Sequence, residues 1–169
     1  MISPDGRWQW NGAQWMPVPA AVTEAPAGAR SMLAVVGGVV AIAGNAALLA
    51  ACFMPFVSWD ATADYEAGSY SVFGFGPIQV AGAGLTLAAG VAAAIILFVL
   101  ANRLAIALAS GLLVAFGLDA VTGWAANSGT YAMQGYHVEP GAFVGVAGGV
   151  VLLVGGVIAA LSLFARRST

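Results

Sequence analysis

Four long apolar runs, separated by short polar segments, set the pattern of this chain. The runs cover residues 32–55, 77–100, 104–123 and 140–165. Each has roughly the 20 residues that an α-helix needs to cross about 30 Å of hydrocarbon, because a helix rises about 1.5 Å per residue. The pattern therefore predicts an all-α integral membrane protein, built as a bundle of four transmembrane helices.

The residues at the ends of these runs support the division. Ser31 stands before the first run, where its side chain can cap a helix, and Pro77 and Pro140 open the second and fourth runs, where the missing proline amide costs nothing. Only residues 101–103 separate the second run from the third. The second and third helices must therefore form an antiparallel hairpin.

The segment between the first two runs, residues 56–76, has a different pattern. Residues 57–59 and 69–75 have β-like character, with turn-prone residues between them. We expect a small extracellular β-hairpin here, between the first and second helices. The aromatic residues of this segment also suit a belt at the membrane interface.

Composition strengthens the membrane assignment. Hydrophobic residues make up 61% of the chain and charged residues only 7%, whereas soluble domains carry about 25% charged residues. So much apolar surface needs lipid around it. A chain of 169 residues then has room for a tail at residues 1–30 and one four-helix transmembrane domain at residues 31–169.

Charge gives the expected orientation. Every positive charge falls outside the four runs and on the same side of the predicted membrane, whereas the acidic residues of segments 56–76 and 124–139 fall on the other side. Because positive residues collect on the cytoplasmic side, we expect a multi-pass protein of the plasma (inner) membrane with both termini in the cytoplasm. The positive residues are Arg7, Arg30, Arg103, Arg166 and Arg167.

Candidate chemistry is sparse. Cys52 is the only cysteine and His137 the only histidine, so no disulfide within the chain and no cysteine–histidine metal site can form. No catalytic serine–histidine–carboxylate pattern, phosphate-binding glycine loop or basic nucleic-acid patch is present. We expect no enzyme activity, no cofactor and no nucleic-acid partner. Cys52 is interpreted as a packing residue, and lipidation is the alternative because residues 49–52 fit the box that precedes the lipid-modified cysteine of bacterial lipoproteins.

The spacing of small residues gives the strongest signal within the runs. In the fourth run, glycines recur every four positions, which makes a flat helix face that another helix can approach closely. The first run offers a row with the same spacing. Such faces either pack the four helices together or dock another membrane protein. The two rows are Gly141, Gly145 and Gly149 in the fourth run and Gly37, Ala41 and Asn45 in the first.

Two polar residues inside the runs need separate consideration. Asn45 lies near the middle of the first run, where we expect its amide to hydrogen-bond another helix. Asp119 lies 16 residues beyond Arg103, or about 24 Å along the helix. This distance predicts that Asp119 lies near the outer boundary of the membrane and reaches headgroups or loop water.

The amino-terminal segment is rich in tryptophan. The pair Asn11 and Gly12 suits a type I′ turn between two very short strands, which would place Trp8, Trp10 and Trp15 on a common surface for a cytoplasmic contact. Residues 16–29, rich in proline and alanine, are typical of an extended linker.

Residues 4–17, which read PDGRWQWNGAQWMP, also carry a resemblance. They resemble the Trp-rich element at the cytoplasmic amino termini of many actinobacterial membrane proteins, whose pattern is P-D-G-x-x-x-W-[DN]-G-x-x-W. The membrane part is similar to uncharacterised four-span proteins of the same bacteria, through Met54, Pro55 and Trp59 after the first helix and the run from Gly141 to Gly149 that opens the fourth. The resemblance implies an actinobacterial source and no particular chemistry.

Two classes of function remain. The preferred hypothesis is a non-enzymatic accessory or interaction subunit of the plasma membrane, which docks another membrane protein or a second copy through its Gly-rich helix faces. The alternative is a small oligomeric channel, transporter component or membrane-acting defence protein. A pore needs a polar stripe along a helix, whereas the polar residues of the runs are scattered singly, which favours the accessory role.

Overall fold

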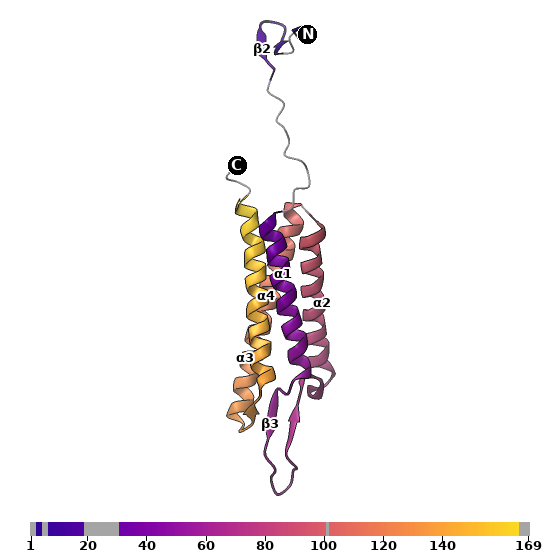
Figure 1. Cartoon of the computed structure of the whole chain (residues 1–169), viewed down its shortest axis with the longest axis vertical. Helices are drawn as coiled ribbons and strands as arrows, with labels where there is room; N and C mark the ends of the chain where they lie inside the picture. The colour runs from indigo at the N-terminus through magenta and orange to yellow at the C-terminus, as the bar shows by residue number, and fades with distance from the viewer. Residues whose placement is uncertain (1–2, 5–6, 19–30, 101, 166–169) are drawn as a thin grey trace.

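The computed structural model describes residues 3–4, 7–18, 31–100 and 102–165. Most of the predicted linker, together with Arg30, Arg166 and Arg167, lies outside the described residues. Four helices run side by side: α1 (Met32–Phe53), α2 (Pro77–Val99), α3 (Arg103–Met133) and α4 (Pro140–Ala165) (Figure 1). All four are long and apolar enough to cross a membrane, so the predicted four-helix architecture is confirmed.

Two small sheets accompany the helices, so the prediction of an all-α fold is incomplete. The first pairs β1 (Trp8–Trp10) with β2 (Trp15–Pro17). The second has the order β4–β3–β5 and contains β3 (Val57–Trp59), β4 (Gly68–Tyr70) and β5 (His137–Val138).

The predicted bounds of the third helix are wrong at its carboxyl end. The apolar run ends at residue 123, but α3 continues for ten more residues to Met133. Hydroxyl groups in this extension bond to the helix itself: Ser128 Oγ donates to the Trp124 carbonyl at 2.6 Å and Thr130 Oγ1 to the Ala126 carbonyl at 2.9 Å. The helix ends just before Gly135, whose φ of 85° is a left-handed conformation that favours glycine.

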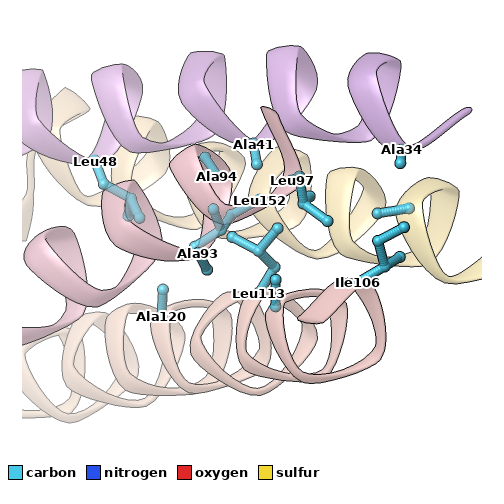
Figure 2. Packing of buried hydrophobic residues seen from close by; sticks show 12 residues of the cluster. Ala34, Ala41, Leu48, Ala93, Ala94, Leu97, Ile106, Leu113, Ala120 and Leu152 are labelled. Atoms are coloured by element: carbon cyan, nitrogen blue, oxygen red, sulfur yellow. The ribbon is translucent and has the colours of Figure 1, made fainter. Parts of the chain in front are cut away.

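The hydrophobic core lies where all four helices meet. Its largest fully buried side chains are Leu97 of α2, Ile106 and Leu113 of α3, and Leu152 of α4. Alanines from every helix fill the space between these side chains (Figure 2). Small residues therefore let the helices approach closely around a few leucine and isoleucine side chains.

The predicted hairpin between the first two helices forms, but its second strand is shorter than predicted, because residues 72–75 form a 3₁₀ helix (Val72–Phe75) after β4 ends at Tyr70. The sheet also gains a third strand that the sequence did not reveal. In the antiparallel register, Val57 of β3 lies opposite both Tyr70 of β4 and Val138 of β5. The connection from α1 to α2 and the connection from α3 to α4 therefore both contribute strands to one sheet. We call this end of the bundle the sheet end and the opposite end, where α2 turns into α3, the Arg103 end.

Packing and hydrogen bonds fasten this sheet to the bundle. Phe56 and Val57 are buried against Ala142 in the first turn of α4. The Glu139 amide donates to the Phe56 carbonyl at 3.0 Å, and the Ser58 hydroxyl donates to the Glu139 carboxylate. The sheet is therefore a fixed cap on the bundle and not a free loop.

On the exposed side of the sheet, an ion pair links the segment between α3 and α4 to the segment between α1 and α2. His137 Nε2 lies 3.0 Å from Asp60 Oδ2. The hydrogen bond to Asp60, and then the negative charge of Asp60, raise the pKa of His137 above its ordinary value of 6.5. Because the folded pKa is raised, this link is present at acidic pH and is lost as the pH rises through the raised pKa.

We expect an NMR titration of the His137 ring to show a midpoint above about 6.5 in the wild-type protein. Asp60→Asn removes the negative charge and should bring the midpoint back towards about 6.5. Asp64→Asn is the matched control, since Asp64 makes no ion pair with His137. An unshifted wild-type midpoint would show that the ion pair does not form in solution.

Candidate functional site

The glycines of α4 face two different neighbours, and those that face α1 are not in the predicted row. One row faces α1. A Cβ built on Gly148 would lie 2.9 Å from Leu48 N, and one on Gly155 would lie 2.7 Å from Ala41 N. On the α1 side, a Cβ on Gly44 would lie 2.6 Å from Leu152 N. Backbone therefore packs directly against backbone along this interface, at glycines spaced by seven residues.

The predicted row of glycines in α4 makes different contacts. Gly141 abuts the Pro55 carbonyl, to which its own amide donates at 3.0 Å. Gly145 lies against the ring of Trp124, and a Cβ on Gly149 would lie 2.9 Å from Val121 N. Gly145 and Gly149 therefore pack against α3, and the row spaced by four residues is not one flat docking face.

The predicted α1 residues also lie inside the bundle. A Cβ on Gly37 would lie 2.6 Å from the Gly155 carbonyl, and Ala41 is fully buried. Asn45 is buried, but its amide donates at 3.0 Å to the Ala41 carbonyl of its own helix. Asn45 Oδ1 faces Gly90 of α2 and has no hydrogen-bond partner in the described residues, so the expected interhelical bond does not form. The Gly-rich faces are thus occupied by the chain itself.

A groove between α2 and α3 is the site that sequence reasoning missed. It has a volume of about 270 Å³ and lies towards the sheet end. Gly82, Ala83, Thr86 and Leu87 form its α2 wall. Leu48 and Cys52 of α1 also line it. We call it the α2–α3 groove, and it exists because α2 packs less extensively against its neighbours than the other helices do.

The α3 wall of this groove carries Asp119 and Asn127 as well as Gly123 and Tyr131. Asp119, Gly123 and Asn127 are all exposed. They belong to a helix that is long and apolar enough to cross a membrane. From Asp119 to Tyr131, the wall extends about 18 Å along the helix.

The level of Asp119 along the bundle follows from the contacts of its neighbours in α3. Its neighbours Ala120 and Val121 pack at Gly149, which is nine residues, or about 14 Å, into α4 from the sheet end. The 26 residues of α4 are about 39 Å long, so a hydrocarbon layer of about 30 Å along α4 would have its sheet-side boundary about 5–14 Å from this level. A third helix that ended at residue 123 would place Asp119 only four residues, or about 6 Å, from the sheet end, so the extension of α3 changes its level relative to α4.

The polar side chains of the groove differ in whether they have a hydrogen-bond partner. Thr86 Oγ1 donates to the Gly82 carbonyl of its own helix at 3.1 Å. Within the described part of the chain, the carboxylate of Asp119 and the amide of Asn127 have no hydrogen-bond or ion-pair partner. An acidic side chain without a partner on a candidate transmembrane helix marks a candidate functional site.

Two glycines leave space along the groove. A Cβ built on Gly82 or Gly123 would meet no atom within 4 Å. These glycines do not serve packing within the bundle, unlike those of α1 and α4. Their small size keeps the groove open, and close approach of another helix needs such positions.

The tryptophans of the tail lie on one face of the β1–β2 hairpin. Trp10 lies opposite Trp15 in the register, with ring centroids 5.6 Å apart, and Trp8 precedes Trp10 by two residues on the same face. All three are exposed. The predicted type I′ turn is wrong: four residues, 11–14, connect the strands, and the Asn11 side chain accepts bonds from the Ala13 and Gln14 amides at 2.9 Å.

Cys52 is buried within the bundle, beside the α2–α3 groove. Cleavage before Cys52, which lipidation requires, would remove nearly all of α1 and its packing against α4. The described residues contain no group of three or more His, Cys, Asp or Glu side chains placed to hold a metal ion.

No model of a known protein family matches this sequence, and comparison with curated proteins finds no similar chain. Any assignment of function therefore depends on the geometry and chemistry of the groove and of the tail.

Proposed function

We propose that this protein is a non-enzymatic accessory subunit of the plasma membrane, and that it receives a transmembrane helix of another membrane protein in the α2–α3 groove. One observation carries the proposal: an open groove, lined by Gly82 and Gly123, holds the exposed and unpartnered Asp119 on a helix long and apolar enough to cross a membrane. The Gly-rich faces of α1 and α4 are filled by the chain itself, so docking uses the groove in their place.

The orientation is part of this proposal. Arg103 lies at the turn between α2 and α3, and positive residues favour the cytoplasmic side of a membrane. With the Arg103 end in the cytoplasm, both termini are cytoplasmic and the sheet faces outward. The exposed Trp8, Trp10 and Trp15 then offer the same partner a second contact on the cytoplasmic side.

Photo-crosslinking from the groove tests this function in intact cells. A photoreactive amino acid at Asn127 should give a discrete adduct with another polypeptide. The same residue at Ala125 should give none, because Ala125 is exposed at a similar height of α3 but does not line the groove.

A blocking variant completes this test. Gly123→Leu fills open space in the groove, so it should remove most of the Asn127 adduct while leaving the fold intact. Gly129→Leu, which also enters open space but lies away from the groove, should leave the adduct unchanged. Equal adducts from Asn127 and Ala125, or adducts with lipid alone, would contradict the proposal.

A further inference from the structure

We propose that the helix received by the α2–α3 groove carries an arginine or lysine whose cationic group pairs with Asp119, so that the partner is a different protein and not a second copy of this chain. This inference rests on the proposed docking function and adds the chemistry of the occupant. It follows from the charge, the depth and the surroundings of Asp119.

The first argument is that the carboxylate of Asp119 lacks a cationic partner within the described residues. Asp119 is exposed on a helix of membrane-spanning length, about 14 Å from the sheet end of α4. A charged group at such depth is costly unless it pairs with an opposite charge, and acids in membrane spans usually do so. In the described residues no cation lies within ion-pair distance of Asp119.

The second argument is the shape of the site around this carboxylate. Asp119 lies one helical turn from Gly123, and Gly82 borders the groove from α2. Both glycines leave open space. A volume of about 270 Å³ suits the inserted side chains of a helix lying over the groove, and the glycines permit its backbone to approach.

The third argument excludes a second copy as the source of the cation. The sequence from residue 31 to residue 165 contains Arg103 as its only arginine and has no lysine. Arg103 lies at the end of the bundle opposite the sheet, about 24 Å along α3 from Asp119. A symmetric dimer would therefore bring two carboxylates and no cation to the groove.

The test uses the full-length protein in phosphatidylcholine vesicles, with a synthetic transmembrane helix of leucine and alanine as the probe. One peptide carries a single arginine at the level of Asp119, which lies about nine residues from the sheet end of α4. A second peptide has leucine at that position, and a third has the arginine near the opposite boundary. Energy transfer between labelled peptide and labelled protein reports the apparent dissociation constant.

We expect the first peptide to bind the wild-type protein about tenfold more tightly than it binds Asp119→Asn, a difference typical of losing one charge-assisted contact. The leucine peptide should not distinguish the two proteins. Asp119→Glu, which keeps the charge, should restore most of the difference. The exposed position of Asp119 predicts unchanged thermal stability for both variants.

The outcomes separate this inference from the docking function. If Gly123→Leu weakens binding of every peptide while Asp119→Asn has no effect, the groove docks a helix but Asp119 binds no cation, and the inference is overturned. If Gly123→Leu also has no effect, the docking function fails as well. Self-association of the protein that depends on Asp119 would identify a second copy as the occupant and likewise overturn the inference.

Discussion

Gly44→Leu should unfold the bundle at a markedly lower temperature than the wild-type protein. A Cβ at Gly44 would lie 2.6 Å from Leu152 N and 2.9 Å from the Gly148 carbonyl. Both atoms belong to the backbone of α4 and cannot move aside as a side chain can. Overpacking of a tight core costs about 1–3 kcal/mol, and we expect the upper part of this range or more because a whole leucine must enter.

Thermal unfolding in mild detergent, followed by circular dichroism, measures this effect. Gly111→Leu is the matched control: it places leucine in the interior of a helix, but the new Cβ meets no atom within 4 Å. Leucine is also a better helix former than glycine by nearly 1 kcal/mol, so this control should be neutral or stabilising. Equal destabilisation by the two variants would show that the interface between α1 and α4 does not pack closely.

Leu152→Ala should have the second largest effect, with a loss of about 2 kcal/mol or more. Leu152 is fully buried among the helices, next to Gly44 of α1 (Figure 2). Lipid is as apolar as leucine, so the loss arises mainly from the cavity and the missing van der Waals contacts.

The control for this prediction is Leu161→Ala in the same helix, where the leucine is 52% exposed. Its truncation leaves no internal cavity and should change stability by less than about 0.5 kcal/mol. Denaturant titration of both variants in the same detergent gives the comparison. If the two truncations cost the same, the core of the bundle is looser than the structure shows.

The sequence by itself determined the number of helices and most of their ends. A segment that crosses hydrocarbon must be long, apolar and internally hydrogen-bonded, and each of these conditions acts on one segment alone. Pro77 and Pro140 begin α2 and α4 as predicted, because proline is favoured in the first helical turn. The short strand at residues 57–59 was also predictable, because its β-like character belongs to that segment alone.

Local pattern did not determine where α3 ends. The helix continues past residue 123 because backbone hydrogen bonds, and not apolar character, sustain a helix. This extension changes the level of Asp119 relative to α4. The third strand, β5, also escaped prediction, because its partner β3 lies about 80 residues earlier in the sequence.

The tertiary structure alone decided which small residues pack and which remain open. Gly82 and Gly123 look no different in sequence from Gly44 and Gly155, yet the first two border a groove while the last two contact another backbone. The difference depends on the angle and distance at which neighbouring helices pass, and one helix does not encode these quantities. The α2–α3 groove, and the place of Asp119 within it, therefore exist only once all four helices are packed.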